Sequence, residues 1–549
     1  MKKRLLSLIL ALCIIISFSP STLSVNLPEV DVRTEGLTPA QPQEAPAEKP
    51  RDAGAERRTI YVSNEGTEED DGATAETPTT LARATELANE GKKPVEIVVL
   101  GQVSVDTWTS PTVETTLRGG DENAELLFEY CSASDGAYNI SLADALTIDD
   151  IKFNCNYTDY FFSRYYGTYT IVANGYPLVI ASGVQYSYYT ADTIVDGKTC
   201  STSSCYVIGG GLDEDITGGT HVEIYTSLPL TYVYGGGVNG SVESNVYLHI
   251  ENCGKIQHVR AGGYANKKDA KVNGNITLDF INSVTDNPIY GGGYARSSYS
   301  AEVTGSICIN LSGLNNGFGR PIYGGGYGKN APVVGNIRFN ISNTKMNNNA
   351  AAIYGGGYNS DVTGDIFIHI KENSLISEET VWGGGTGDST ITGGVTITVD
   401  DSTEVIGEIH AGGNEGADVI GNVSITVSGG PQSACPTIFA TGKGEDEDNP
   451  AQVDGNVSIT LHGSRANVYT LDKFGEVTSD HAVTIILDDT DELSGAVRGD
   501  SKLDQHLYNY EKNTPTRTGN GASVIVKGDY TSTGIHGFPE VVIEDGGIL

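Results

Sequence analysis

The sequence predicts an all-β fold, a right-handed parallel β-helix, in which short strands wind into stacked coils behind a short N-terminal capping helix. Two observations lead to this prediction. A glycine-rich motif returns roughly every 29 residues, and each repeat also contains a strand whose apolar residues alternate with polar ones. Repeats of this length are typical of solenoids, in which each unit packs only on its neighbours.

The glycine motif is a triplet that follows an apolar residue and, in most copies, an aromatic one. It reads IYGGGY at 289–294, 322–327 and 353–358, VWGGGT at 381–386, and is degenerate at 207–211, 233–237, 259–264, 409–414 and 438–443. In each copy, the last residue before the glycines or other small residues serves as a reference point. These residues are 208, 234, 260, 290, 323, 354, 382, 410 and 439, so the spacing between successive copies runs from 26 to 33 residues. A drifting period indicates that insertions fall in loops while a constant core motif stacks.

The second motif of each repeat is an apolar residue and a glycine followed by an alternating strand, as in VTGDIFIHI at 362–370. Apolar residues at every second position predict strands with one buried face, and β-branched residues are typical of such strands. Equivalent residues of stacked coils lie one strand spacing apart, about 4.8 Å. One continuous buried ladder is therefore expected to contain Ile276, Ile307, Ile337, Ile366, Val395, Val423 and Val457.

Other all-β folds fit this pattern less well. A sandwich needs no internal period, and a propeller blade needs about 40 residues and four strands. The stretch 77–93, TPTTLARATELANEGKK, reads as an amphipathic helix. We expect it to cover the open end of the first coil, because uncovered strand edges promote aggregation.

The N-terminal residues of the chain suggest export. Residues 1–24 combine three basic residues with an apolar run and then small residues, which predicts a signal peptide. Residues 25–58 are rich in Pro, Glu and Ala and predict a disordered spacer. We expect a cap and irregular coils over 59–205, regular coils over 206–464 and further coils over 465–549.

The strongly acidic composition limits the kinds of partner that this protein is expected to bind. The net charge is −36 at pH 7. Nucleic acids and anionic membranes are bound by basic patches, so neither is an expected partner. No second apolar stretch is long enough to form an integral membrane segment. The localisation expected from the sequence is secreted or extracellular, with association to the cell surface as a further possibility.

The motifs also resemble a known group of proteins. Residues 173–180 (ANGYPLVI) followed by the VYGGG and VTGN-type units of 207–461 resemble the exported, adhesin-like β-helix surface proteins of Firmicutes. The resemblance covers about half the chain. It implies the β-helix fold, a cell-surface location and repeats without a catalytic motif.

Aromatic residues flank the glycine triplets and are expected to form two columns on the stacked coils. In an extended segment Tyr323, Gly325 and Tyr327 share one face. Because sugar rings stack on aromatic faces and glycines leave the backbone open, the columns suggest a glycan trough. Its candidate residues are Tyr290, Tyr294, Tyr323, Tyr327, Tyr354, Tyr358 and Trp382. The alternative is structural: stacked rings stabilise the coils, and glycines allow bends with positive φ.

An enzyme of the same fold is a second possibility, because many β-helix proteins cleave acidic polysaccharides. Fold alone is weak support for an activity. The nearest acidic candidates are Asp149, Asp150, Asp361, Asp388 and Glu415, which also read as solvated turn residues. The sequence contains no recognised catalytic signature and no spacing typical of a metal site, so no catalytic residue, metal or cofactor is predicted.

The sequence therefore predicts a secreted, adhesin-like β-solenoid that interacts with an extracellular glycan or protein. The alternatives left open are a polysaccharide lyase or hydrolase and a purely structural spacer. An enzyme should show carboxylate and basic side chains clustered on adjacent coils, whereas a binding protein should show repeated aromatic and polar side chains.

Overall fold

The structure, a computed structural model, describes residues 57–498 and 522–543. Within these ranges it leaves out residues 130–137, 157–163, 187–193 and shorter stretches elsewhere. The predicted signal peptide and all but the last two residues of the predicted spacer lie outside the described residues. All described residues belong to one compact unit, Gly54–Leu549.

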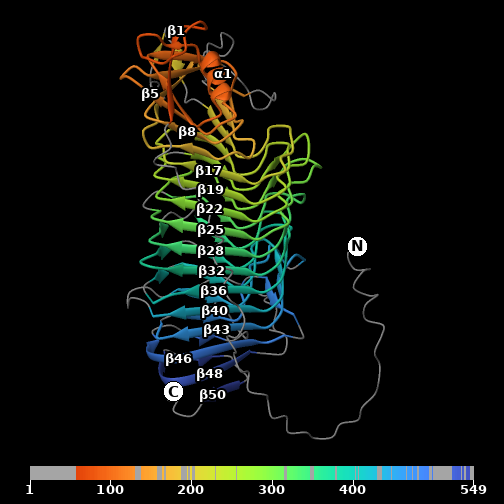
Figure 1. Ribbon diagram of the computed structural model, residues 1–549. Coiled ribbons are helices and arrows are strands. Elements are labelled where there is room, and N and C mark those ends of the chain that lie inside the picture. Colours follow the sequence, from red (N-terminus) through yellow and green to blue (C-terminus); the bar gives the residue numbers. More distant parts are fainter. Residues whose placement is uncertain are drawn as a thin grey trace. The chain divides into compact units, whose positions relative to one another are not determined.

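The dominant element is a sheet of 17 parallel strands within the described residues, which we call the long sheet (Figure 1). Each strand pairs in parallel with the equivalent strand of the next coil, so the coils stack in sequence order. Its strands, in pairing order, are β1 (Arg58–Thr67), β2 (Val95–Val99), β5 (Thr115–Gly119), β8 (Leu146–Asp149), β12 (Leu178–Ile180), β17 (Thr220–Ile224), β19 (Val246–Glu251), β22 (Ile276–Ile281), β25 (Ile307–Ser312), β28 (Ile337–Ser342), β32 (Ile366–Lys371), β36 (Val395–Val399), β40 (Val423–Ser428), β43 (Val457–His462), β46 (Val483–Leu493), β48 (Ala522–Ser532) and β50 (Glu540–Ile543).

A second sheet contains the strands that enter the glycine triplets, and we call it the aromatic sheet. It has 15 strands in the described part of the chain. They are β4 (Trp108–Thr109), β7 (Ile140–Ser141), β11 (Thr168–Val172), β16 (Ser204–Ile208), β18 (Leu230–Tyr234), β20 (Ile256–Arg260), β23 (Ile289–Tyr290), β26 (Ile322–Tyr323), β30 (Ala352–Tyr354), β34 (Thr380–Trp382), β38 (Glu408–His410), β41 (Thr437–Phe439), β44 (Asn467–Tyr469), β47 (Val497–Arg498) and β49 (Ile535–His536).

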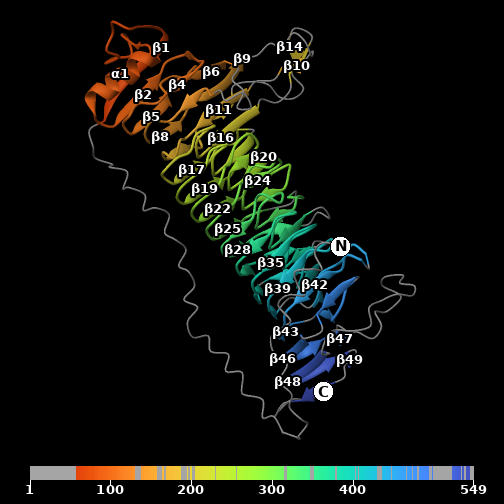
Figure 2. The ribbon, with the colours of Figure 1, turned by 90° about the vertical axis from the view of Figure 1, so that its right-hand side faces the viewer.

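A third, six-stranded sheet contains the apolar residue that begins the second motif, and its strands β35, β39 and β42 are visible in Figure 2. Its strands are β27 (Val333–Val334), β31 (Val362–Thr363), β35 (Thr390–Thr392), β39 (Asp418–Ile420), β42 (Ala451–Asp454) and β45 (Gly475–Val477). The remaining strands form small sheets: β3 (Gln102–Val105), β6 (Glu125–Glu129), β9 (Lys152–Asn156) and β13 (Gln185–Tyr186); β21 (Tyr264–Ala265) and β24 (Tyr294–Ala295); β29 (Lys345–Met346), β33 (Leu375–Ile376) and β37 (Glu404–Val405); β10 (Arg164–Tyr165), β14 (Ile194–Val195) and β15 (Lys198–Cys200). The predicted fold class, a parallel β-solenoid with one short helix, is thus confirmed within the described residues.

The predicted apolar ladder is present. Each of its residues is the register partner of the next, and every one is at most 2% exposed. In β32, Ile366, Ile368 and Ile370 are buried, whereas the intervening side chains are only half-buried. Burial on every second position fills the space between the sheets with β-branched side chains.

The capping helix is also confirmed. Helix α1 (Leu81–Gly91) begins after Thr80, whose hydroxyl accepts a hydrogen bond from the Arg83 backbone N–H. Such an N-cap satisfies one of the free donors at a helix start. Leu87 and three further residues of one helix face are buried, and the helix contacts β1, the first strand of the long sheet. Among the described residues, no helix is long and apolar enough to span a membrane.

The glycine triplets have neither of the two roles that the sequence suggested for them, an open surface for a ligand or bends with positive φ. All of their residues at 291–293, 324–326, 355–357 and 383–385 are buried, so the expected open glycine floor is wrong. None of them has a positive φ, so bends do not require them either. A Cβ atom on Gly325 would lie 2.8 Å from the backbone nitrogen of Gly357. Glycine is needed because the backbones of successive coils approach too closely for any side chain.

Candidate functional site

The predicted aromatic residues form one cluster on the outer side of the aromatic sheet. We call Tyr290, Tyr323, Tyr354 and Trp382 the inner column, and Tyr264, Tyr294, Tyr327 and Tyr358 the outer column. The two columns pack on each other as a hydrophobic cluster separate from the main core. The structure therefore brings all seven predicted site residues together.

The rings stack along the coils. In the inner column, the ring centroids of Tyr290 and Tyr323 are 5.1 Å apart with an interplanar angle of 6°, and those of Tyr323 and Tyr354 are 4.8 Å apart at 12°. In the outer column, Tyr294 and Tyr327 stack at 4.2 Å, and Tyr358 continues the stack at 5.2 Å. Edge contacts join the columns, for example between Tyr290 and Tyr327 at 80°. Offset stacks and edge-to-face pairs are the favourable arrangements of aromatic rings.

The two columns differ in burial, and therefore in whether a ligand can reach their rings. Every inner-column side chain is at most 8% exposed, and the rings of Tyr323, Tyr354 and Trp382 each stack on a ring in the coil before and in the coil after. In the outer column, Tyr264, Tyr327 and Tyr358 are only half-buried. A ligand at this surface therefore meets the outer column. The predicted binding role of the seven residues stays a prediction.

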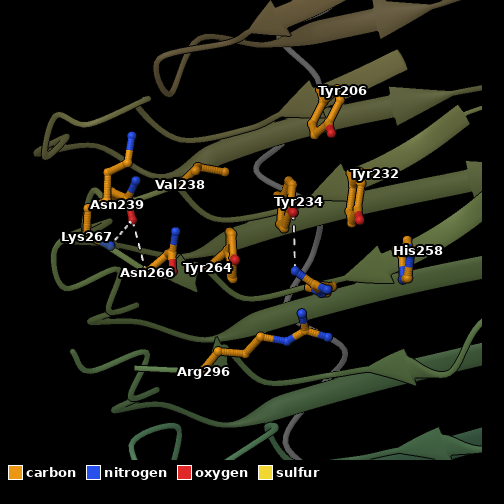
Figure 3. A pocket seen from close by; sticks show the side chains of 11 residues that line it. Tyr206, Tyr232, Tyr234, Val238, Asn239, His258, Tyr264, Asn266, Lys267 and Arg296 are labelled. Atoms are coloured by element: carbon orange, nitrogen blue, oxygen red, sulfur yellow. Dashed lines mark hydrogen bonds between the residues drawn. The ribbon is translucent and has the colours of Figure 1, made fainter. Parts of the chain in front are cut away.

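A pocket lies at the N-terminal end of the columns, and we call it the aromatic pocket (Figure 3). Its cavity volume is about 190 Å³. The residues lining it are Tyr206, Tyr232, Tyr234, Val238, Asn239, His258, Arg260, Tyr264, Asn266, Lys267 and Arg296. Aromatic walls with a few polar groups are typical of small-ligand sites.

Strand register builds the walls of the aromatic pocket. Tyr206 of β16, Tyr232 of β18 and His258 of β20 are register partners, so their rings stack at 4.9 Å and 4.5 Å. Two residues further along the strands, Arg260 pairs with Tyr234 and takes the place of a ring in the inner column. The opposite rim is polar: Asn239 Oδ1 accepts hydrogen bonds from the backbone N–H groups of residues 266 and 267.

Two guanidinium groups lie among these rings. Arg260 is 5% exposed, and its Cζ lies 3.5 Å from the ring centroid of Tyr294 and 5.0 Å from that of Tyr264. Its Nη1 donates a hydrogen bond of 3.2 Å to the Tyr234 hydroxyl. Arg296 is exposed, and its Nε donates to the Tyr294 hydroxyl at 3.1 Å. Cations placed over aromatic faces are attracted by the ring quadrupole.

The pocket changes the ionisation of its imidazole. Burial, then the charges of Arg260 and Arg296, lower the pKa of His258 to about 4, while Asp286 acts weakly in the opposite direction. Burial also raises the pKa of the Tyr234 hydroxyl above its ordinary value. At neutral pH the His258 imidazole and the Tyr234 phenol are therefore both neutral.

A second, open hollow continues from the pocket along the outer column. It is lined by Ala295, Arg296, Ser297, Tyr327, Gly328, Lys329, Asn330 and Asn359. Because Arg296 lines both, the two depressions are adjacent along the coils. Together they offer a path from Tyr206 to Asn359 with half-buried tyrosines and amide side chains along it.

Sequence reasoning missed most of the pocket. Each glycine motif is entered through one residue, and Tyr206, Tyr232 and His258 each lie two positions before that residue. Side chains two positions apart in a strand share a face, so alternation alone places these three on the same face as the entering residues. This alternation is the first sequence signal that points to the pocket. The single arginine in an otherwise aromatic column, Arg260, was the second available signal.

Three of the five acidic candidates of the enzyme hypothesis, Asp361, Asp388 and Glu415, link one coil to another. Asp361 Oδ1 accepts a hydrogen bond from the Thr390 backbone N–H at 2.9 Å, and Asp388 forms a 2.9 Å ion pair with Lys329. Asp149 Oδ1 accepts from the backbone N–H of the next residue. Glu415 accepts from the Thr386 hydroxyl. Among the described residues, no group of three or more His, Cys, Asp or Glu side chains is arranged to hold a metal ion.

A network of imidazoles and carboxylates on the outer face of the long sheet was not predicted. His249 of β19 lies 3.2 Å from Asp279 through Nδ1 and 3.2 Å from Glu251 through Nε2. Tyr247 donates to the same Asp279 at 2.9 Å, and one coil earlier His221 lies 2.6 Å from Glu223. This is the kind of cluster expected of an enzyme. However, both nitrogens of His249 already contact carboxylates, so His249 has no free position for a substrate proton.

The network should make stability depend on pH. Burial alone would lower the pKa of His249, but hydrogen bonds with Asp279 and Glu251 outweigh it and the pKa is raised. The stabilisation is therefore complete below the unfolded-state pKa of about 6.5 and is lost as pH rises through the folded-state pKa. We expect the melting temperature to fall less between pH 6 and pH 9 in His249→Gln than in the unmodified protein.

Thermal unfolding followed by circular dichroism at both pH values measures this difference. His462→Gln is the matched control, because His462 lies 3.2 Å from Asp488 in a pair whose side chains are 57% and 42% exposed. An identical pH dependence in His249→Gln and the unmodified protein would contradict the expectation.

No protein-family model, curated protein or solved structure matches this chain.

Proposed function

We propose that this chain is an exported surface protein of the adhesin-like kind its repeats resemble, and that it binds a glycan along the aromatic pocket and the adjoining hollow. The observation that carries the proposal is the aromatic pocket, whose half-buried rings Tyr206, Tyr232, His258 and Tyr264 surround a cavity of about 190 Å³. A cavity of this volume holds about six water molecules at ~30 Å³ each, which is comparable to one sugar ring.

The chemistry of the surface suits carbohydrate. Sugar rings present C–H groups that pack on aromatic faces and hydroxyl groups that need hydrogen-bond partners. The half-buried rings of the pocket and Tyr327 supply the first kind of contact. Asn266, Asn330 and Asn359 supply amides beside them. Stacked coils repeat these groups along one direction, which suits a polymer of repeated sugar units.

Affinity electrophoresis tests the proposal, with gels that contain plant, mucin or bacterial polysaccharides. We expect retardation of the unmodified protein by at least one polymer. The double variant Tyr264→Ala/Tyr327→Ala should raise the dissociation constant about tenfold, because losing two stacking contacts removes roughly 1.4 kcal/mol of binding free energy. These two rings are chosen because they are half-buried, whereas inner-column variants would also disturb the fold.

Tyr176→Ala is the matched control, because Tyr176 is 40% exposed and lines neither depression. Retardation that the double variant retains would contradict a site on the outer column. If no polymer retards the protein, the hypothesis that remains is a purely structural spacer. A rise in reducing ends within the gel would favour the lyase or hydrolase.

A further inference from the structure

We propose that the aromatic pocket selects an acidic sugar, a ring that carries a carboxylate or a sulfate ester, and that Arg260 and Arg296 hold its charged group. This inference rests on the proposed glycan-binding function and specifies which glycans the protein takes.

The first argument is the burial of Arg260 without a counter-charge. Among the described residues, no carboxylate lies within ion-pair distance of its guanidinium group, although 95% of the residue is covered. Burying a charge is unfavourable unless a partner compensates it. The tyrosine rings around it compensate in part, and one hydrogen bond to Tyr234 uses one of five donors. The remaining donors are available to an anion.

The second argument is the charge around the pocket. The chain contains 70 acidic and 34 basic residues, yet no Asp or Glu is among the residues that line the pocket. Arg296 adds a second cation. Its Cζ lies 5.4 Å from the ring centroid of Tyr294, the same ring that Arg260 contacts at 3.5 Å. Figure 3 shows the Arg296 side chain running beneath Tyr264. Two guanidinium groups on one ring form a local positive site in an acidic protein.

The third argument is the match between these groups and an acidic sugar. A guanidinium group binds an oxyanion through two parallel hydrogen bonds, which adds geometric selectivity to the charge. The rings of Tyr206, Tyr232 and Tyr264 line the same cavity and suit the body of the sugar. His258 is neutral at physiological pH, so its ring offers one donor and one acceptor to hydroxyl groups.

The test compares polymers that differ only in charge. The probes are polygalacturonate beside its methyl ester, and dextran sulfate beside dextran, with the full chain at 0.15 M salt so that distant charges are screened. We expect the acidic member of at least one pair to bind ten times more tightly or better. The carboxylate and sulfate sources are distinguished by which pair shows the preference.

Three variants locate the selectivity. Arg296→Gln should reduce the preference for the acidic polymer about tenfold at an unchanged melting temperature, because Arg296 is exposed. Arg260→Lys keeps the charge but not the paired donors and should reduce the preference as well. Arg338→Gln is the matched control: it removes the same charge from a guanidinium that lies 4.7 Å from the Phe367 ring centroid on the long sheet, and it should retain the full preference.

A titration of His258 by NMR separates this inference from the proposed function. Adding D-glucuronate should raise the pKa of His258 above its value of about 4, because an anion in the pocket favours the imidazolium ion, whereas D-glucose should not. Binding of acidic and neutral polymers within a factor of two, without a glucuronate effect, would overturn the acidic preference and leave glycan binding intact. A glucuronate effect without binding of any polymer would support the anion site and overturn the polymer role.

Discussion

Alanine at position 324 should lower the free energy of unfolding by about 3 kcal/mol, the upper part of the range for overpacked cores. Gly324 is the first glycine of the IYGGGY triplet at 322–327. A Cβ atom there would overlap the carbonyl oxygen of Gly355 in the next coil and lie 2.6 Å and 2.8 Å from side-chain atoms of Ile337 and Phe339. Since one obstacle is backbone, the two coils must separate to make room.

The measurement is thermal and urea unfolding, combined with hydrogen exchange of the strands β26, β28 and β30, because long repeat proteins can unfold locally. Gly218→Ala is the matched control, since a Cβ atom at Gly218 meets nothing within 4 Å and its φ is not positive. If both variants are equally stable, the close approach of the coils is not the reason for the triplet.

Truncation of Tyr323 to alanine should cost about 3 to 5 kcal/mol of stability, as for other large aromatic residues in cores. Tyr323 is 6% exposed and stacks between Tyr290 and Tyr354. Its loss would leave a cavity in the cluster and remove two ring contacts worth about 0.5 to 1.5 kcal/mol each beyond burial. Near-ultraviolet circular dichroism should also lose intensity, because stacked tyrosines contribute to it together.

The conservative change Tyr323→Phe provides the control, since it keeps the ring and its two stacking partners. We expect it to remain within about 1.5 kcal/mol of the unmodified protein, the usual limit for volume-conserving changes. If Tyr323→Ala unfolds at the same urea concentration as Tyr323→Phe, the inner column does not stabilise the coils. A large loss in Tyr323→Ala alone would establish the structural role, which leaves ligand contacts to the outer column.

The two substitutions probe the same feature, the distance between successive coils. Glycine at 324 and 325 lets the backbones approach, and the approach brings Tyr323 and its neighbours into stacking distance. The glycine triplet and the aromatic residues thus depend on each other: the glycines set the distance between coils at which the rings stack. From the sequence alone the glycines are expected to form a surface that a ligand can reach, because a repeat shows that residues share a column but not how deeply the column is buried.

Periodicity by itself was sufficient for the arrangement of the coils. The ladder from Ile276 to Val457 and the helix at Leu81–Gly91 lie where the pattern predicts them. This success has a physical reason. Stacking sets one strand spacing between equivalent residues, and alternation assigns each side chain to the inner or outer face. Both quantities are local and can be read along the chain.

Only the tertiary structure decided which outward side chains are accessible and which charges lack partners. Tyr323 and Tyr327 occupy equivalent faces in the pattern, yet the first is buried and the second half-buried. Arg260 reads as an irregular member of an aromatic column, and its significance depends on Tyr294 from the following coil and on Tyr232 from the preceding one. Sequence therefore determined the repeat, the strands and their register. Burial and charge compensation depend on atoms from several coils and on the turns between them, so they exist only in the folded stack.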